Sequence, residues 1–402
     1  MIRYLTAGES HGEALIGVVE GMPAKVPLTA DAINTHLARR WLGYGRGGRS
    51  KIENDKVHIY SGIRFSETLG SPISFRIDNG AYEKDRAGWP EKMAVEGDGE
   101  GVERVTMPRP GHADLAGMQK YEFDDIRPVI DRSSARETAM RVACCSVARC
   151  LLNAFGIHVG SHVVSIGEAG YEHPDEWVER RNALLAEGGA KAVYEAADES
   201  ETRMLSADMT QRCIDHIEEA KAARDSLGGI YEVIVTGVPP GLGSYVHWDR
   251  RLDGQLVQAI CSIQAQKAAE VGDGFLNARL PGSKVHDPIV LDDNHEYGRR
   301  TNHAGGIEGG TTNGQPIIVR GYMKPIPTLI KPLDSVDTDS KKPKPTRYER
   351  SDITSVPAAS TVAEATVAYT IANAFLEKFG GDSLPEIRRH IKAARASNGD
   401  AA

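Results

Sequence analysis

The sequence predicts one large domain that mixes α-helices with β-strands. Short apolar runs, such as residues 14–20 and 230–237, indicate strands, whereas residues 29–41 and 135–155 have the apolar spacing of helices. Length alone suggests two or three domains, but no clear linker divides the 402 residues. We therefore expect a single domain that spans residues 1–402.

The first expected elements are a strand at 14–20, a helix at 29–41 and a strand at 56–64. Ile33, Leu37 and Trp41 fall on one face of that helix. Residues 81–109 are polar and rich in glycine, which indicates a long surface loop of the kind that often forms a lid. A long helix is expected at 135–155, because residues 134–137 fit a capping box and Gly156 suits a helix end.

Further along the chain we expect helices at 208–227, 252–271 and 361–379 and a strand at 230–237. Long loops are expected at about 280–314 and 324–351. The strand that ends at Gly21-Met22-Pro23 and its following helix resemble the strand that ends at Gly237-Val238-Pro239 and its helix. This spacing is too long for a solenoid repeat, and either an ancient duplication or two unrelated halves could explain it.

Composition narrows the class of protein. The net charge of −8 argues against a general nucleic-acid binder, and no apolar run approaches the ~20 residues that cross a membrane. No signal peptide is visible at the N-terminus. Five cysteines without CxxC spacing indicate a reducing, cytoplasmic setting. We also expect no metal site, because HExxH, EF-hand and Cys/His zinc patterns are missing.

Residues 39–51 carry five basic side chains and no acidic one, although the whole chain is acidic. Arginine forks match phosphate and carboxylate oxygens, and glycine lets the backbone approach a ligand. This segment therefore predicts a pocket for a small, highly charged anion, with a flexible surface loop as the alternative. Residues 43–48 match GxGxxG, but a helix precedes them and a strand follows, which excludes the dinucleotide fingerprint.

Two short motifs place a histidine between turn residues. Ser10 and His11 lie within GESHG, and histidine titrates near the second pKa of a phosphate ester, so His11 suits protonation of a departing phosphate. Arg109 and His112 lie in RPGHAD, where Asp114 could simply cap the next segment. For both motifs the alternative is a structural turn.

Three other segments are candidates for ligand contacts. Residues 131–138 are expected at the start of a helix, where they would either bind an anion or form only a capping box. For residues 305–314 and 324–328 we expect either loops that hold a cofactor or ordinary surface loops. Arg350 and Asp352 are expected either to belong to the site or to form a surface ion pair.

Taken in order, these segments closely resemble the chorismate synthase family over essentially the full chain. The matching segments are GESHG, LARRWLGYGRGGR, GSPIS, RPGHADL, RSSARETAMRVA, DSLGG, PPGLGS, SIQAQKAAEVGDGF, GGIEGGTTNGQPI, KPIPT and RSDITSVPAAS. The chain departs from the family at Asp131, where glycine is frequent, at Ser50, where methionine is common, and at Thr354-Ser355, where cysteine-alanine is frequent. We expect Asp131 to alter slightly the turn that enters the long helix.

The resemblance implies an α+β fold with helices layered between antiparallel β-sheets, and a homotetramer. It implies a carbon–oxygen lyase that removes phosphate from 5-enolpyruvylshikimate 3-phosphate by 1,4-anti elimination and gives chorismate, in the shikimate pathway of aromatic amino acid biosynthesis. The family needs reduced FMN, although the reaction involves no net redox change. Some members reduce FMN with NADPH, and others depend on an external flavin reductase.

The resemblance also implies roles for individual residues. His11 would protonate the departing phosphate, His112 would stabilise the reduced flavin, and Asp352 would relay the abstracted proton. The implied substrate-binding residues are Ser10, Arg40, Arg46, Arg49, Arg109, Arg136 and Arg350, with Arg40 and Arg46 at any NADPH site. The implied flavin-binding residues are Arg132, Ser133, Ser134, Gln264, Ala265, Gly309, Lys324, Pro325, Ile326, Pro327, Thr328 and Arg350. An anion-binding scaffold protein and a nicotinamide-dependent oxidoreductase are the alternative functions.

Overall fold

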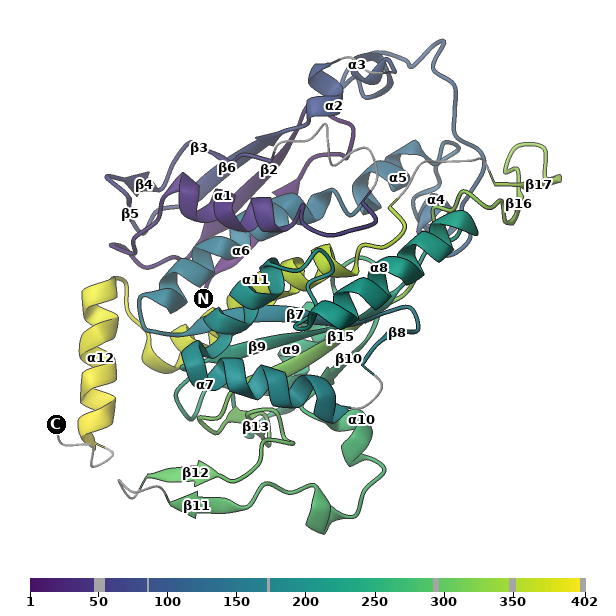
Figure 1. The fold of residues 1–402 in the computed structure, drawn as a ribbon. Helices are drawn as coiled ribbons and strands as arrows, with labels where there is room; N and C mark the ends of the chain where they lie inside the picture. The colour runs from purple at the N-terminus through teal and green to yellow at the C-terminus, as the bar shows by residue number, and fades with distance from the viewer. Residues whose placement is uncertain (47–54, 85–86, 172–173, 292–295, 347–351, 398–402) are drawn as a thin grey trace.

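The computed structural model describes residues 1–46, 55–84, 87–171, 174–291, 296–346 and 352–397. Two antiparallel β-sheets enclose layers of helices between them (Figure 1). This is the α+β arrangement that the sequence resemblance implied.

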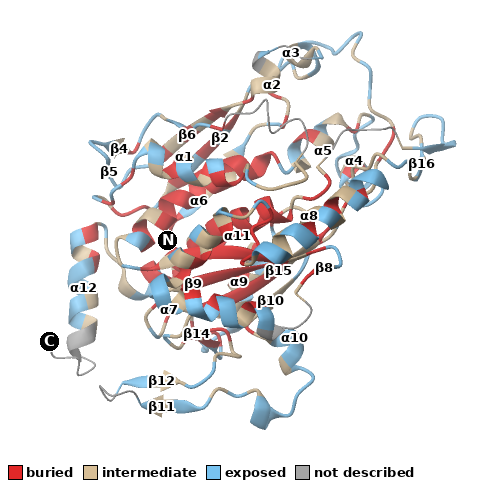
Figure 2. Cartoon of the chain, viewed as in Figure 1, coloured by how far each residue is buried: buried red, intermediate tan, exposed pale blue. Residues whose placement is uncertain are grey.

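The first sheet has the strand order β1-β2-β6-β3, formed by Arg3–Ala7, Ala14–Glu20, Ile73–Asp78 and His58–Ile59. Helix α6 (Glu137–Asn153) packs against β1, β2 and β6, and α1 (Ala30–Arg39) lies beside α6. Burial alternates along β2, so Leu15 and Val19 face α6 whereas Ile16 and Val18 are exposed (Figure 2). This alternation is typical of an antiparallel strand with one open face.

The second sheet has the order β10-β15-β9-β7-β8, formed by Gln266–Val271, Ile317–Met323, Gly229–Thr236, His158–Ile166 and Ala169–Gly170. Helices α11 (Val356–Phe379) and α9 (Leu252–Cys261) pack on its inner face. Helix α7 (Pro174–Asp198) covers the opposite face, where Ile234 packs with Val193. Strand β9 is therefore buried on both sides, and every residue from Tyr231 to Val235, including Glu232, is buried.

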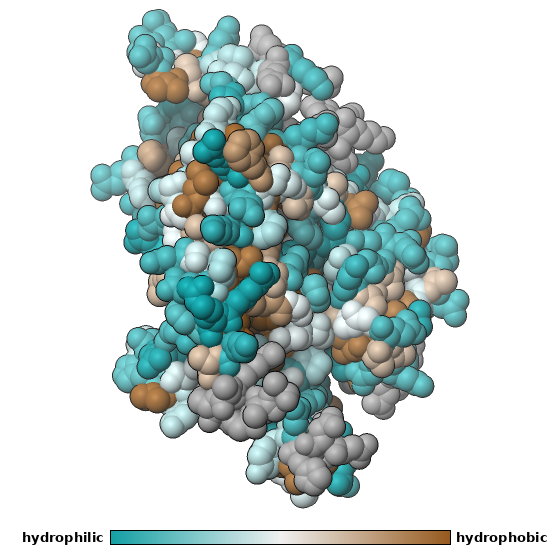
Figure 3. All heavy atoms as spheres, turned by 90° about the vertical axis from the view of Figure 1, so that its left-hand side faces the viewer, coloured by the Kyte–Doolittle hydropathy of each residue, from teal (hydrophilic) through white to brown (hydrophobic). Residues whose placement is uncertain are grey.

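Shorter elements connect the layers and decorate the surface. The remaining helices of eight residues or more are α4 (Asp114–Tyr121), α8 (Ala207–Ala222) and α12 (Leu384–Ser397), and the short ones are α2 (Gly80–Glu83), α3 (Trp89–Lys92), α5 (Arg127–Ser133) and α10 (Gly274–Asn277). The hairpins are β4–β5 (Ile63–Arg64, Glu67–Thr68), β11–β12 (Ile289–Leu291, Tyr297–Arg299), β13–β14 (Ile307–Glu308, Thr311–Thr312) and β16–β17 (Asp334–Val336, Pro343–Pro345). The face that carries α12 and β4–β5 is mainly hydrophilic, with isolated apolar side chains (Figure 3).

The two sheets and their helices are formed by elements that occur in the same order along the chain. The pair β1–β2 is followed by α1, β3, β6 and α6, and the pair β7–β9 is followed by α9, β10, β15 and α11. Gly21 and Gly237 follow corresponding strands with φ of +78° and +80°, and a Cβ on either would lie 2.2 Å from the carbonyl oxygen of Met1 or Gly156. These matches favour an ancient duplication over two unrelated halves.

One hydrophobic cluster joins both sheets to the central helices. Phe75 of the first sheet, Val233 of the second and Phe375 of α11 all belong to it. We infer from this shared core that the chain folds as one domain.

Several local expectations from the sequence are wrong. Residues 252–271 form α9 and then strand β10 instead of one helix, because the chain turns at Ala265 (φ +65°) and β10 pairs with β15. The expected capping box at 134–137 forms only in part: Ser134 Oγ accepts the N–H of Arg136 at 3.2 Å, but the Glu137 carboxylate accepts from Thr6 and Gln264 instead of from the backbone of Ser134. Asp131 lies inside α5 and so alters no turn. The strand expected at 56–64 is interrupted at Ser61-Gly62, and β7, β8 and α7 were not expected.

Candidate active site

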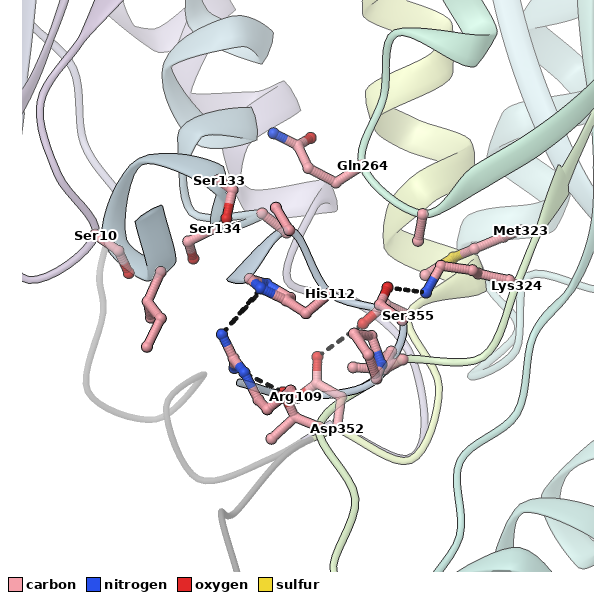
Figure 4. A pocket seen from close by; sticks show the side chains of 18 of the residues that line it. Ser10, Arg109, His112, Ser133, Ser134, Gln264, Met323, Lys324, Asp352 and Ser355 are labelled. Carbon is pink, nitrogen blue, oxygen red and sulfur yellow. Dashed lines mark hydrogen bonds between the residues drawn. The ribbon is translucent and has the colours of Figure 1, made fainter. Parts of the chain in front are cut away.

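A cavity of about 710 Å³ opens where the two halves of the chain meet. Its walls come from four connections: the β1–β2 turn, the segment between β6 and α6, the α9–β10 turn, and the segment between β15 and α11. In Figure 4, Ser133 and Ser134 at the end of α5, Gln264 from the α9–β10 turn and His112 border the same space, with Lys324 at the right and Asp352 below. Segments far apart in the sequence therefore share one site.

The cavity brings together most of the predicted site residues. Those that line it are Ser10, His11, Arg109, His112, Ser133, Ser134, Gln264, Ala265, Lys324, Ile326, Pro327, Thr328 and Asp352. Among the described residues, those that lie outside its lining are Arg40, Arg46, Arg132, Arg136, Gly309 and Pro325. Arg49 and Arg350 fall within 47–54 and 347–351, outside the described residues.

His11 is held on its edge and on its face. Its Nδ1 lies 2.6 Å from Oδ1 of Asp131, whose carboxylate is fully buried. The Trp89 ring stacks on the imidazole, with ring centroids 3.9 Å apart and planes 17° from parallel. Because 21% of the His11 side chain stays exposed, the ring can still meet a ligand in the cavity.

His112 has a similar anchor. Its Nδ1 lies 2.5 Å from Oδ1 of buried Asp114, which also accepts a hydrogen bond from Arg109 Nε at 2.8 Å. Burial alone would raise the pKa of Asp114, but the hydrogen bonds from His112 and Arg109 outweigh burial and hold this pKa well below its usual range. The Asp114 carboxylate thus positions both side chains, which goes beyond capping α4.

Two contacts join the segment around His112 to the segment after β15. Arg109 Nη1 donates to Thr328 Oγ1 at 3.0 Å, and Lys324 Nζ donates to the Gly111 carbonyl oxygen at 2.8 Å. Burial, with a smaller contribution from Lys267, lowers the pKa of Lys324. A bound anion would favour the charged form of this lysine. Lys324 is therefore well placed to bind a phosphate or an anionic ring in the cavity.

Asp352 lies at the start of the segment that leads into α11. Its Oδ2 lies 2.9 Å from Arg46 Nη1 and accepts a hydrogen bond from Ser355 Oγ at 3.0 Å. Arg46 therefore sits immediately behind the cavity wall, paired with a predicted catalytic carboxylate. Asp352 and Ser355 both line the cavity, whereas the alternative ion pair of Asp352 with Arg350 falls on a residue outside the described ones.

Arg40 and Arg136 converge on one buried carboxylate. Asp55 lies 3.3 Å from Arg40 Nη1 and 2.5 Å from Arg136 Nη1. Arg136 also donates to Asn79, and Arg40 donates to Thr138 and to the carbonyl oxygen of Ala135, a cavity residue. These two arginines therefore form a layer directly behind the cavity instead of projecting into it.

The predicted flavin residues divide into two groups. Ser133, Ser134, Gln264 and Ala265 face the cavity, and Oε1 of Gln264 is buried without a hydrogen-bond partner among the described residues. Arg132 instead donates to the carbonyl oxygen of Thr6 at 3.0 Å, outside the cavity lining. Gly309 forms the turn between β13 and β14, where Tyr245 is the nearest neighbour.

Some lining residues were not singled out from the sequence. Trp89, Arg127, Met323 and Ser355 all contribute to the cavity wall. The guanidinium of Arg127 lies 5.2 Å from the Trp89 ring centroid, a cation–π contact. Trp89 could have been singled out from the sequence, because it is a large aromatic residue within the glycine-rich loop 81–109. Nothing in the sequence distinguishes Met323 and Arg127 from ordinary strand and helix residues.

Comparison with known proteins identifies the family. The family model described as chorismate synthase matches residues 2–376. The chain belongs to the chorismate synthase family. A chorismate synthase from Salinibacter ruber (strain DSM 13855 / M31) is 78% identical over 401 residues, which cover 99% of each chain. A chorismate synthase from Chlorobium chlorochromatii (strain CaD3) is 54% identical and covers 98% of each chain.

The fold agrees with this family. A solved structure entitled "Crystal Structure of Chorismate Synthase" superposes with a TM-score of 0.78 at 39% identity, over 98% of this chain and 97% of that chain. Chorismate synthases are carbon–oxygen lyases that act on phosphates, in the shikimate pathway. The family, the α+β fold and the enzyme class expected from the sequence are therefore confirmed. Within the described residues, no helix is both long enough and apolar enough to span a bilayer, and no three metal-ligating side chains gather at one point.

Proposed function

We propose that this cavity removes phosphate and the C6 proton from 5-enolpyruvylshikimate 3-phosphate to give chorismate. The observation that carries the proposal is the meeting of His11, His112 and Asp352 in one cavity with Arg109 and Lys324. A 1,4-elimination from a substrate with a phosphate and a carboxylate requires cations, a proton donor and a proton acceptor. These side chains supply each of the three.

The proposed steps assign one proton transfer to each end of the substrate. The C3–O bond breaks, its electron pair leaves with the phosphate, and His11 donates a proton to that phosphate. The C6–H bond breaks, Asp352 receives the proton, and the electron pair left at C6 forms a new ring double bond while the existing double bond shifts to C3, which gives the diene of chorismate. Arg109 and Lys324 hold the anionic groups, because fixed charges in a partly desolvated site need no reorganisation during the reaction.

The cavity also fits a reduced flavin. The unpartnered Oε1 of Gln264 can accept a hydrogen bond from a ring N–H, and Ala265, Ile326 and Pro327 provide an apolar wall. His112, Ser133, Ser134, Lys324 and Thr328 are the further residues that would hold it. When bound, reduced FMN supplies electron density transiently as the phosphate departs.

We also propose a homotetramer in the cytoplasm. Exposed Leu5, Ile16 and Val18 on the open face of the first sheet support self-association, and the five free thiols suit a reducing compartment. Light scattering after size exclusion would measure the mass of the assembly. A stable monomer at micromolar concentration would contradict the tetramer.

An anaerobic assay tests the activity. The protein is mixed with 5-enolpyruvylshikimate 3-phosphate and chemically reduced FMN, and phosphate release is followed together with chorismate absorbance. Equimolar phosphate and chorismate are expected. Binding without turnover would indicate an anion-binding protein, and NADPH oxidation coupled to substrate reduction would indicate an oxidoreductase.

A second arm replaces reduced FMN with oxidised FMN and NADPH. Turnover there would support NADPH as reductant, for which Arg40 and Arg46 are the predicted contacts. Activity that returns only when an external flavin reductase is added would assign the reduction to that partner.

A further inference from the structure

Both cavity histidines rest on buried aspartates, but the two aspartates differ in their other partners. Asp114, which anchors His112, also accepts from Arg109 at 2.8 Å. For Asp131, which anchors His11, the guanidinium of Arg127 lies farther away, at 3.9 Å. The charge of Asp114 is therefore shared closely with an arginine, whereas the charge of Asp131 is directed mainly at His11.

We propose that Asp131 is the positioning residue that makes His11 a general acid. Its Oδ1 accepts the Nδ1–H of His11, and this bond fixes the ring so that the proton on Nε2 is presented to the departing phosphate. This inference rests on the proposed function of the cavity.

The backbone around Asp131 supports this role. Its carbonyl oxygen accepts the N–H of Ser10 at 3.1 Å, so the same residue fixes the turn and the ring that follows it. Trp89 covers one face of the imidazole. The edge and face of the His11 ring and the backbone of the preceding Ser10 are thereby held together, which is what a proton donor aimed at one oxygen needs.

The charged groups near His11 come from both sides of the cavity. Asp131 and Arg127 belong to α5, and the cavity that the ring lines also contains Arg109, His112, Lys324 and Asp352. Asp131→Asn leaves these mainly cationic neighbours in place. The substitution therefore weakens the anchor of the ring without removing any other charged group of the cavity.

The first test compares kcat and KM of steady-state turnover with reduced FMN. For Asp131→Asn we expect kcat to fall at least about 10-fold, short of the 10²–10⁴ contributed by a general acid itself. The KM for 5-enolpyruvylshikimate 3-phosphate should stay near its wild-type value, because the change affects the proton donor and not the groups that bind the substrate. Asp131→Glu keeps the carboxylate and should recover part of the lost kcat.

Asp125→Asn is the matched control, because Asp125 precedes the same helix and bonds only backbone N–H groups of Val105 and Arg127 among the described contacts. It should change thermal stability without lowering kcat. Melting temperature and FMN affinity, measured for every variant, separate misfolding from mispositioning.

A double-mutant cycle gives the deciding result. In a His11→Ala background, Asp131→Asn should cause no further loss of kcat, because the group that it positions is missing. Equal losses in both backgrounds, or a wild-type kcat in Asp131→Asn, would overturn the positioning role. If the wild-type protein releases no phosphate from 5-enolpyruvylshikimate 3-phosphate, the proposed function has failed instead.

Discussion

At the scale of single residues, His11 is the group on which the proposed phosphate departure depends. General acid catalysis contributes roughly 10²–10⁴ in rate, so His11→Ala should raise the barrier by ~3–5.5 kcal/mol. Phosphate release at pH 7 with reduced FMN measures this effect. His247→Ala is the control, because His247 is an exposed histidine paired with Asp249 away from the cavity lining. Near-normal turnover of His11→Ala would refute the role.

The two histidine motifs show which site residues a local pattern can reveal. Glycine and proline around Ser10-His11 and Arg109-His112 mark turns whose polar side chains were expected to meet ligands, and the cavity contains all four. The anchor of His11 is 120 positions away in the chain, so no local spacing links the two residues. Trp89 was missed for the same reason, since its contact with His11 exists only after the loop folds back.

At the scale of elements, residues 266–271 illustrate how tertiary pairing overrides propensity. Their sequence, QKAAEV, is rich in helix formers, and yet they form β10 against β15. The switch occurs at Ala265, a non-glycine residue at φ +65° that lines the cavity. Such strain is tolerated where surrounding structure imposes it. For regular helices with a single apolar face, such as α1, the sequence predicted the helix ends within a few residues.

The hairpin β16–β17 ties down the end of the loop 81–109. Thr106 Oγ1 donates to Asp337 at 3.0 Å, and Arg104 pairs with Asp339 at 2.6 Å. Asp337→Ala should increase hydrogen exchange and protease cleavage within 81–109, with little effect on global unfolding. Asp334→Ala, an exposed change in the same hairpin, is the control. Unchanged exchange in both variants would contradict the tether.

The same tether should respond to acid. Hydrogen bonds from Ser340 and Thr106 lower the pKa of Asp337 to about 2. A carboxyl with a lowered pKa contributes its stabilisation above its ordinary pKa near 4 and loses it as the pH falls towards the lowered value. Loop exchange should therefore rise between about pH 4 and pH 2 in the wild type, and it should already be high at neutral pH in Asp337→Ala.

At the scale of the whole molecule, a buried ionic cluster joins the helical layers to the second sheet. Glu364 of α11 accepts from Arg39 at 2.6 Å, from Arg149 at 2.7 Å and from Ser161 of β7 at 2.7 Å. Arg203, also in contact with Glu364, has its pKa lowered to about 9 by burial and by the neighbouring arginines. Glu364 thus compensates several buried cations at once.

Glu364→Gln should lower the free energy of unfolding by about 3–5 kcal/mol, because it leaves buried charges uncompensated. Urea denaturation measures the change. Glu377→Gln is the control, since Glu377 pairs with Arg250 at the half-exposed surface, and it should cost less than about 1 kcal/mol. Burial would raise the pKa of Glu364, but the arginines outweigh burial and lower it, so the stabilisation should persist above about pH 4.5 and disappear in acid. Equal losses in both variants would contradict this role.

The layered architecture and the family could be predicted from the sequence, because motifs spread over the full chain agreed with one another. Whether each arginine lines the cavity or lies behind its wall could not be predicted. Arg40 and Arg136 share Asp55 behind the cavity wall, and only the packing of α1 against α6 determines that arrangement. Charge in the sequence predicts an anion site, but it does not distinguish a side chain in the wall from one behind it.

The matched halves have a consequence for how the chemistry arose. The segments from β6 to α6 and from β15 to α11 occupy equivalent places in the two halves, and each forms one wall of the cavity. An ancestor with a single copy could have enclosed such a space only by pairing with itself, and its opposing walls would have been identical. An elimination that adds a proton at one end of the substrate and removes one at the other needs unlike walls. Two copies joined in one gene can diverge separately, and the two walls here do differ, with His112 in the segment before α6 and Asp352 in the segment before α11.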